Sequence, residues 1–377
     1  MKKLIQGLCL SLISISAYAQ ITNDSLEYRI RPDSVRTGSL YLSVNNFNYL
    51  RNYEFYNHFQ DGYTLYGLQL EPQLVYYVHP QLAIMGGIHV RKDFGGEGIY
   101  KTYPLFSIKY QKDNFAFING VLEGNVHHRF IEPLFDVENR INNPVEYGTQ
   151  FLFNKPSLFL DAFINWRRMI YKPSPQQEQI LAGVSSDIRL LADDNVRLSL
   201  PLQLTIFHQG GQIDTLDKPI QTLLNTATGF RFEYKTNGFV QKIRTENYFV
   251  YFNELSNTPL LPYPSGKGVY LNGGIDTRYG SLTGSYWNAN GYFSPLGMPL
   301  FQSVSQKIYE EGQSRKHRQL LFIRYAFQQQ LIPHFYIDVR LEPVMDLDLP
   351  TKKFELYHSL FLVYKQDFKL FGKKSEK

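Results

Sequence analysis

Charged side chains at every second position are the residues of this chain that could do chemistry. Asp338, Arg340 and Glu342 alternate with Val339 and Leu341. Side chains of a β-strand point alternately to its two faces, so the charges share one face and the aliphatic residues share the other. Acidic and basic groups on one face either form ion pairs with neighbouring strands or line a polar passage that selects ions.

The same alternation predicts a set of charged residues that face one common interior. The predicted lumen and constriction residues are Glu123, Arg129, Glu132, Asp136, Glu138, Asp161, Arg167, Arg197, Asp276, Arg278, Arg324, Asp338, Arg340 and Glu342. One interpretation is a wall that sets the selectivity of an aqueous pore. The other is a salt-bridged, partly filled interior that keeps the structure rigid. The two signs are balanced, so neither anions nor cations are favoured.

The three acids Glu132, Asp136 and Glu138 lie in a long connection, residues 130–147. Folded inward, this connection would narrow the lumen, and its acids would face Arg129, Arg167 or Arg197 across a constriction. The alternative is an ordinary surface loop. The longest connection, residues 293–318, is expected to be solvated, with a short helix within 302–311 and a basic end that contacts lipopolysaccharide or a partner.

Hydrolytic chemistry would need a nucleophile and a base within hydrogen-bond reach. The possible groups are His127 and His128 on one strand, Ser185 and Asp187 on another, and His208 near a strand end. Nothing in their spacing brings these groups together, so we predict that the chain is not an enzyme. Metalloprotease, nucleotide-binding and zinc motifs are absent from the sequence, and we expect no cofactor and no metal.

The elements that must position these residues are strands with one apolar face. In residues 196–206, Val196, Leu198, Leu200, Leu202, Leu204 and Ile206 alternate with mostly polar residues. About 16 such strands are predicted, with a range of 14–18. They span residues 39–50, 64–78, 82–92, 101–111, 115–127, 146–154, 157–169, 178–191, 196–208, 221–234, 240–252, 268–278, 281–292, 319–329, 335–345 and 354–368.

Short and long connections alternate between these strands. Asn237-Gly238 is a strong hairpin signal in one short turn, whereas residues 209–220 form one of the long connections. Outer-membrane barrels have short periplasmic turns and long external loops. The pattern predicts an all-β fold, a transmembrane antiparallel up-and-down barrel with both termini in the periplasm.

The chain outside the strands suits export to such a membrane. Residues 1–19 read as a signal peptide, with Lys2 and Lys3 before an apolar stretch and Ala17-Tyr18-Ala19 as the cleavage site. Residues 20–38 are predicted to be a periplasmic lead-in, residues 39–371 the barrel and residues 372–377 a tail. The net charge of +5 includes Lys2 and Lys3, so the mature chain is too weakly basic to indicate nucleic-acid binding.

These features together resemble a Gram-negative outer-membrane barrel, with the aromatic and Asn-rich character of barrels from Bacteroidota. The chain has 28 Tyr and 28 Phe, which suits aromatic girdles at both membrane interfaces. The resemblance implies contact with outer-membrane lipid and lipopolysaccharide. The leading hypothesis is a porin-like channel for small solutes. The alternatives are a non-conducting accessory barrel in a larger assembly, with protein partners, and an outer-membrane hydrolase.

Overall fold

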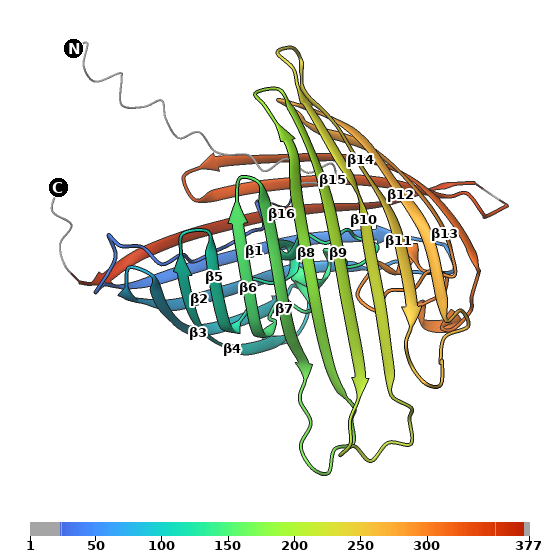
Figure 1. The fold of residues 1–377 in the computed structure, drawn as a ribbon, viewed down its shortest axis with the longest axis horizontal. Helices are drawn as coiled ribbons and strands as arrows, with labels where there is room; N and C mark the ends of the chain where they lie inside the picture. Colours follow the sequence, from blue (N-terminus) through green and yellow to red (C-terminus); the bar gives the residue numbers. More distant parts are fainter. Residues whose placement is uncertain (1–22, 24, 351, 373–377) are drawn as a thin grey trace.

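The computed structural model describes residue 23, residues 25–350 and residues 352–372, so the predicted signal peptide lies outside the described residues. These residues form a closed barrel of 16 antiparallel strands, as predicted (Figure 1). The strands are β1 Leu40–Glu54, β2 Thr64–His79, β3 Leu82–Asp93, β4 Lys101–Lys112, β5 Phe115–Val121, β6 Tyr147–Lys155, β7 Leu158–Arg168, β8 Glu178–Ala192, β9 Val196–Gly210, β10 Gln221–Lys235, β11 Val240–Glu254, β12 Ser265–Thr277, β13 Gly280–Asn290, β14 His317–Ile332, β15 Phe335–Asp346 and β16 Phe354–Phe371.

Each strand pairs with its neighbours in the sequence, and β1 closes the ring against β16. Leu40 pairs with Phe371, so the first and last strands begin and end at the same rim. We call this rim the short-turn end, because the short connections lie there, and the opposite rim the long-loop end. The assignment of the short-turn end to the periplasm stays a prediction.

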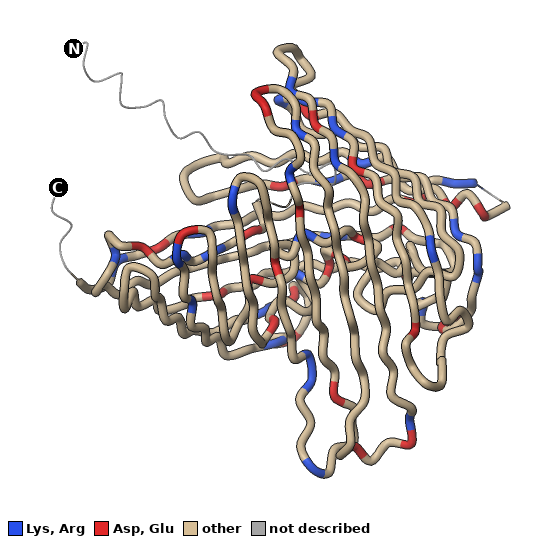
Figure 2. The backbone as a smooth tube through the Cα atoms, viewed as in Figure 1, with Lys and Arg blue, Asp and Glu red and all other residues tan. Residues whose placement is uncertain are grey.

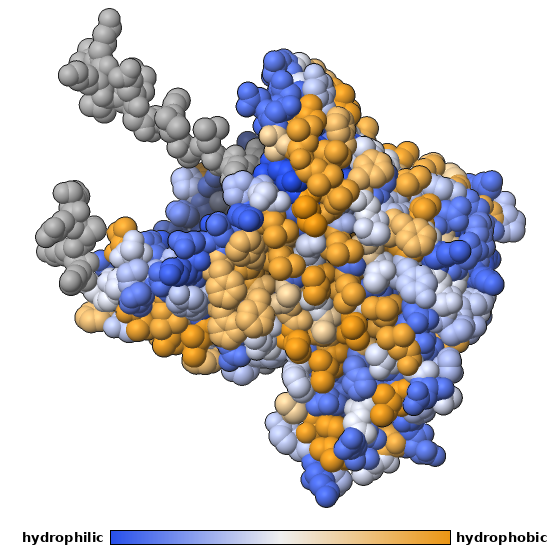
Figure 3. All heavy atoms as spheres, in the orientation of Figure 1, coloured by the Kyte–Doolittle hydropathy of each residue, from blue (hydrophilic) through white to orange (hydrophobic). Residues whose placement is uncertain are grey.

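Outward side chains are mainly apolar and inward ones mainly polar, as the alternation requires. In β9, Leu200 and Leu202 are exposed on the outer face, whereas Ser199 and Gln203 are buried in the lumen. Figure 3 shows hydrophobic residues across the middle of the visible wall and hydrophilic residues at the loops. A lipid-facing charge near the midplane costs about 2–4 kcal/mol, which explains why the strand charges point inward.

The lumen is filled from both ends by three segments of chain. The N-terminal residues 25–30 enter at the short-turn end, where Ser25 donates a 2.8 Å hydrogen bond to Asp338. Residues 122–146 leave the wall after β5 and carry two short helices, η1 (Asn125–His128) and α1 (Asn139–Asn142). Residues 292–305 fold in from the long-loop end. The segment predicted as a lead-in therefore packs inside the barrel.

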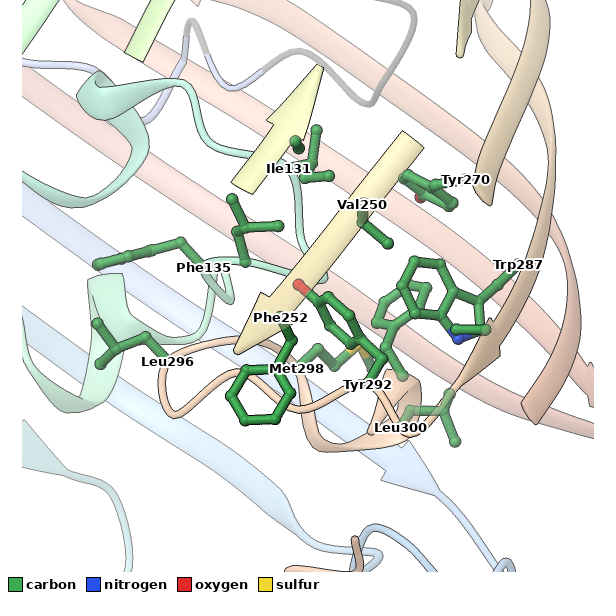
Figure 4. Packing of buried hydrophobic residues seen from close by; sticks show 14 of the residues in the cluster. Ile131, Phe135, Val250, Phe252, Tyr270, Trp287, Tyr292, Leu296, Met298 and Leu300 are labelled. Carbon is green, nitrogen blue, oxygen red and sulfur yellow. The ribbon is translucent and has the colours of Figure 1, made fainter. Parts of the chain in front are cut away.

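Residues 130–135 and 292–301 meet inside the barrel in an apolar cluster with inward side chains of β1 and of β7 to β16. Figure 4 shows Ile131, Phe135 and Leu296 packed near Trp287 and Tyr292. Residues 293–305 are mostly buried, which contradicts the expectation of a solvated loop for this half of the connection, whereas residues 306–316 are mostly exposed. The short helices there are η2 (Pro299–Phe301) and η3 (Ile308–Glu310), so the helix expected within 302–311 is only one turn.

The strands of the barrel wall are shortest at β5 and β6. The strand predicted over residues 115–127 ends at Val121. Gly120 has φ +111, and a Cβ there would lie 2.1 Å from the carbonyl oxygen of Phe106, so only glycine allows this bend. Asn125 and Arg129 also have positive φ, which turns the chain into the lumen. Among the described residues, no helix is long and apolar enough to cross a membrane.

Candidate active site in the lumen

A row of inward side chains crosses four neighbouring strands, β1 to β4. Asn45 pairs with Glu71 across β1 and β2, and His89 pairs with Tyr103 across β3 and β4. Leu70 pairs with Val90 and Gln73 with Gly87, so Glu71 and His89 stand opposite each other. Ladder register alone therefore brings the four side chains to one level of the lumen.

Hydrogen bonds within this row orient the imidazole of His89. Its Nδ1 lies 2.9 Å from Oε1 of Glu71, and the amide of Asn45 donates to Oε2 of Glu71 at 2.8 Å. The His89 side chain is fully buried, and its Nε2 has no hydrogen-bond partner among the described residues. A carboxylate that accepts from Nδ1–H leaves the lone pair on Nε2, which is the arrangement of a general base.

Arg140, from the helix α1, places a cation beside this row. Its guanidinium lies 3.6 Å from Oε1 of Glu71 and donates to the side chain of Gln69 at 2.7 Å. The carbonyl of Ile141 accepts from Gln69 and from Arg91, so α1 is fixed to the row of residues just above His89. The helix therefore covers the site on the side of the long-loop end.

A cavity of about 100 Å³ lies below α1, between the inner face of β1 to β5 and residues 122–145. Asn45, Glu71 and Arg140 form part of its polar lining. The apolar lining comes from Leu26, Ile30, Met85, Leu105, Ile118, Val121, Leu122, Pro144 and Val145. A cavity with one polar corner and an otherwise apolar wall is suited to an amphipathic ligand.

His128, one of the possible hydrolytic groups named from the sequence, is fully buried in the lumen and cannot serve as a base. Its Nδ1 lies 2.8 Å from Asp161 and its Nε2 lies 3.2 Å from Glu146. Burial opposes its charge, but the attraction of the two carboxylates raises the pKa of His128 to about 9. Both nitrogens are then protonated donors, and the cation joins residues 122–146 to β7.

His127, the preceding residue, is held in the opposite protonation state, as a neutral imidazole. Its Nε2 accepts a hydrogen bond from the backbone N–H of Tyr28, and its Nδ1 donates to the carbonyl of Gly124. Burial and the nearby Arg29 lower the pKa of His127 to about 3. This neutral imidazole anchors the N-terminal segment and has no free nitrogen for catalysis.

The other hydrolytic groups named from the sequence are not assembled either. Ser185 is buried in the middle of β8, and Asp187 accepts from Arg231 at 2.9 Å. His208 lies on the outer face and pairs with the hydroxyl of Thr222 at 2.9 Å. Ser185 and Asp187 face the lumen, whereas His208 faces outward, so the wall separates the imidazole from the other two groups.

Most of the predicted lumen charges form ion pairs inside the barrel. Figure 2 shows how the acidic and basic residues are distributed along the strands. The ion pairs of the set include Glu123 with Lys109, Asp161 with His128, Arg197 with Glu233 at 3.6 Å, Asp276 with Arg244 at 2.9 Å, Arg324 with Glu132 at 2.5 Å, Asp338 with Arg340 at 2.7 Å and Glu342 with Arg51 at 3.7 Å. This arrangement corresponds to the salt-bridged, partly filled interior.

The three loop acids fold inward but do not face the cations that we expected. Glu132 meets Arg324, and Glu138 accepts from the hydroxyl of Tyr63 at 2.8 Å. Burial and the neighbouring Glu138 raise the pKa of Asp136 above its ordinary range. The partners differ from Arg129, Arg167 and Arg197 because the inward segment crosses the lumen toward β1 and β14.

Two of the expected lumen cations occupy other positions. Arg278 is exposed in the turn after β12, because this strand ends at Thr277, so it does not line the lumen. Arg129 follows η1 and stacks over the ring of Phe159. Arg167 faces inward at the end of β7 that lies at the long-loop end.

Sequence reasoning missed Asn45, Glu71, His89 and Arg140. Alternation along β2 and β3 could have placed Glu71 and His89 on the inner face, but the turn alone does not set them opposite each other, because a bulge between Tyr77 and His79 shifts the register by one residue. Arg140 could not be found in this way, because α1 lies in a segment without strand periodicity. No group of three or more His, Cys, Asp or Glu side chains in the described part is placed to hold a metal ion.

The closed barrel, its apolar outer wall and its charged lumen define an outer-membrane β-barrel protein. The chain belongs to the Lipid A 3'-O-deacylase-type family, whose model matches residues 30–373. The prediction that the chain is not an enzyme is therefore wrong, because this family is named for an acyl-ester hydrolase. No curated protein matches the sequence.

Solved outer-membrane proteins share the fold. The structure is similar to OprD from Pseudomonas aeruginosa, with 8% identity, a TM-score of 0.52, and coverage of 91% of this chain and 98% of that chain. A loop L8 deletion mutant of OmpT, an outer membrane protein of Vibrio cholerae, has 12% identity, a TM-score of 0.50, and coverage of 88% and 100%. These identities support a shared fold and no shared activity.

Proposed function

We propose that this protein is an outer-membrane hydrolase that removes the 3'-O-linked acyl chain of lipid A. The observation that carries the proposal is the buried dyad of Glu71 and His89, in which Nε2 of His89 is unpartnered. Family membership supplies the bond that is cleaved, an ester between a sugar hydroxyl and a fatty acid.

The geometry of the dyad supports general-base hydrolysis. His89 takes a proton from a water molecule through Nε2, and the hydroxide attacks the carbonyl carbon of the ester. The tetrahedral intermediate collapses when the bond from this carbon to the sugar oxygen breaks, and protonated His89 returns the proton to that oxygen. The products are a free fatty acid and the sugar hydroxyl, so atoms and charges balance.

Neighbouring groups of the site have matching roles. Glu71 stabilises the imidazolium that forms at His89, as a carboxylate does when it orients a catalytic histidine. Arg140 is the cation available to stabilise the negative oxygen of the intermediate. The apolar part of the cavity offers a place for the acyl chain.

Mass spectrometry of lipid A incubated with the purified protein in detergent micelles tests this proposal. We expect the loss of one acyl chain at the 3' position and the appearance of the free fatty acid. The His89→Gln variant should lower the rate at least about 100-fold, because proton transfer by a positioned base contributes about 10²–10⁴-fold. Glu71→Gln should lower it less.

The matched control is His208→Gln, which removes an imidazole from the outer face and should leave the rate unchanged. Intact lipid A after prolonged incubation with folded wild-type protein would contradict the proposed function. Equal activity of wild type and His89→Gln would leave the deacylase class standing but would remove His89 from the mechanism.

The porin-like channel predicted from the sequence is less well supported. Its polar lumen is present, but three inward segments and the ion pairs between them occupy that lumen. Steady single-channel conductance of the folded protein in a planar bilayer, with ion selectivity that changes in Arg340→Glu, would favour the channel over the hydrolase.

A further inference from the structure

The barrel wall has a notch above the hairpin of β5 and β6, and it opens toward the long-loop end. Ser107, Gly120, Gly148 and Asn165 form one row of paired residues across β4, β5, β6 and β7. Above this row β4 continues to Lys101, whereas the chains of β5 and β6 turn into the lumen. With a strand spacing of about 4.8 Å, the two sides of the notch, β4 and β7, are about 14 Å apart.

Residues 101–106 of β4 form a free edge, because β5 pairs only with residues 107–112 of this strand. Pro104 lies in this edge and has no N–H to leave unsatisfied. Its carbonyl oxygen accepts a 2.8 Å hydrogen bond from the hydroxyl of Tyr147, at the start of β6. Unpaired backbone groups are costly in a lipid environment, so this satisfied edge identifies the notch as a stable feature of the wall.

The notch leads directly to the candidate active site. Tyr103 is an inward residue of the free part of β4, and its ring centroid is 5.8 Å from that of His89. Leu105 of the same edge lines the cavity, as do Pro144 and Val145 at the base of the notch. A chain that enters between β4 and β7 therefore meets apolar side chains first and the dyad one strand further on.

Basic residues stand on both sides of the notch. Lys101 begins β4 on one side, and Arg167 and Arg168 end β7 on the other. The ammonium of Lys101 lies over the ring of Tyr100, and the buried Nε of Arg167 has no hydrogen-bond partner among the described residues. Large apolar residues are exposed close by on the outer wall, among them Phe106 and Trp166.

We propose that this notch admits one acyl chain of a phosphate-bearing glycolipid sideways from the outer leaflet, while Lys101, Arg167 and Arg168 hold its phosphate. The inference deepens the proposed function and rests on it for the position of the long-loop end outside the cell. An apolar cavity reached between two basic edges matches a ligand with an anionic head and a hydrocarbon chain. The substrate thus reaches His89 without leaving the membrane.

Quenching of a fluorescent label by brominated acyl chains tests lateral entry without catalysis. The single cysteine of the chain, Cys9, is replaced by Ser, and bimane is attached at Gln73→Cys, which lines the cavity on β2. The protein is placed in phosphatidylcholine vesicles that contain phosphatidic acid with brominated chains. We expect a loss of fluorescence comparable to that of a label at the lipid-facing Ile164→Cys.

Three controls make this result specific. A label at Arg197→Cys, in the lumen away from the notch, should not be quenched. The substitution Val145→Trp should block entry and restore the fluorescence at position 73 but not at position 164, whereas Val44→Trp on the outer face of β1 should change neither. Replacing Lys101 and Arg168 by Gln should reduce quenching by brominated phosphatidic acid more than quenching by brominated diacylglycerol.

The two proposals fail in different ways. Fluorescence at position 73 that persists while position 164 is quenched overturns the notch, even if lipid A is deacylated. Quenching at position 73 without deacylation supports the notch and overturns the hydrolase. Equal quenching by phosphatidic acid and diacylglycerol in wild type would remove the phosphate role of Lys101, Arg167 and Arg168.

Discussion

The two halves of the lumen differ in what fills them. Beside β8 to β14 the interior is an apolar core of the kind found in soluble proteins, with Trp287, Tyr292 and Phe301 fully buried. Beside β1 to β5 the interior is a cavity bordered by Asn45 and Glu71. One barrel thus combines a solid half, which fixes the inward segments, with a hollow half that holds an unpartnered imidazole.

This contrast places rigidity and chemistry on opposite walls. Close-packed interiors resist rearrangement, so the segments they hold are fixed in space. Residues 122–146 belong to both halves, because Ile131 and Leu134 join the apolar core whereas Arg140 lies beside Glu71. The core therefore positions the cation of the site from the far side of the lumen.

The largest expected effect is that of breaking the ion cluster between the inward segment and the solid half. Arg324 contacts Glu132 at 2.5 Å and Glu342 at 3.6 Å. Arg324→Met leaves two buried carboxylates without this cation, which should lower the free energy of unfolding by about 3–5 kcal/mol. Urea unfolding in detergent micelles measures this loss. Arg278→Met, in an exposed turn, is the control and should change stability by less than about 0.5 kcal/mol.

The second prediction compares equal truncations in the two halves. Leu300→Ala removes a side chain that is 1% exposed in the apolar core and should cost about 2–4 kcal/mol. Met85→Ala enlarges a cavity that already exists, so it should cost less than half as much. Urea unfolding of both variants measures the two losses in the free energy of unfolding and hence their ratio. Equal costs would show that the cavity side is packed as tightly as the core.

The architecture followed from the sequence because alternation is a property of single strands. Each of the 16 strands, β9 among them, carries its own apolar and polar faces, and short turns such as Asn237-Gly238 fix which strands pair. The notch, in contrast, could not be predicted from the sequence. Residues 122–127 extend β5 by periodicity, and only the bend at Gly120 and the positive φ of Asn125 send them inward.

The filled lumen was predictable only in part. Leu296, Met298 and Leu300 make residues 292–305 unusually apolar for a surface loop, and this signal was available in the sequence. The position of α1 was not available, because it depends on contacts such as that between Arg91 and the carbonyl of Ile141. The candidate site therefore combines inward strand residues, which alternation indicates, with a loop cation that no strand pattern indicates.

The third prediction uses the opposite protonation states of two adjacent histidines. The pKa of His128 is about 9, above the ordinary 6.5, so its stabilisation is complete below pH 6.5 and is lost as the pH rises through about 9. The pKa of His127 is about 3, so its stabilisation is complete above pH 6.5 and is lost as the pH falls through about 3. Each change should amount to a few kcal/mol and should be larger for His127, whose pKa departs further from 6.5.

Urea midpoints at several pH values separate these two contributions. His128→Gln should flatten the decline between pH 6.5 and 9, and His127→Gln should flatten the decline on the acid side. If His128→Gln kept the full alkaline decline, the attachment of residues 122–146 to β7 by this cation would be wrong.

The smallest expected effect is at the edge of the notch. Tyr147→Phe removes the hydroxyl that donates to the carbonyl of Pro104, and loss of this hydrogen bond should cost about 1 kcal/mol. The unsatisfied carbonyl would lie at the edge of β4 that borders the notch. The apolar core beside β8 to β14 is not altered by this substitution. Quenching of the label at position 73 should therefore rise or stay equal, while the urea midpoint falls slightly. A fall in quenching would mean that the phenol of Tyr147 guides the acyl chain instead of closing the base of the notch.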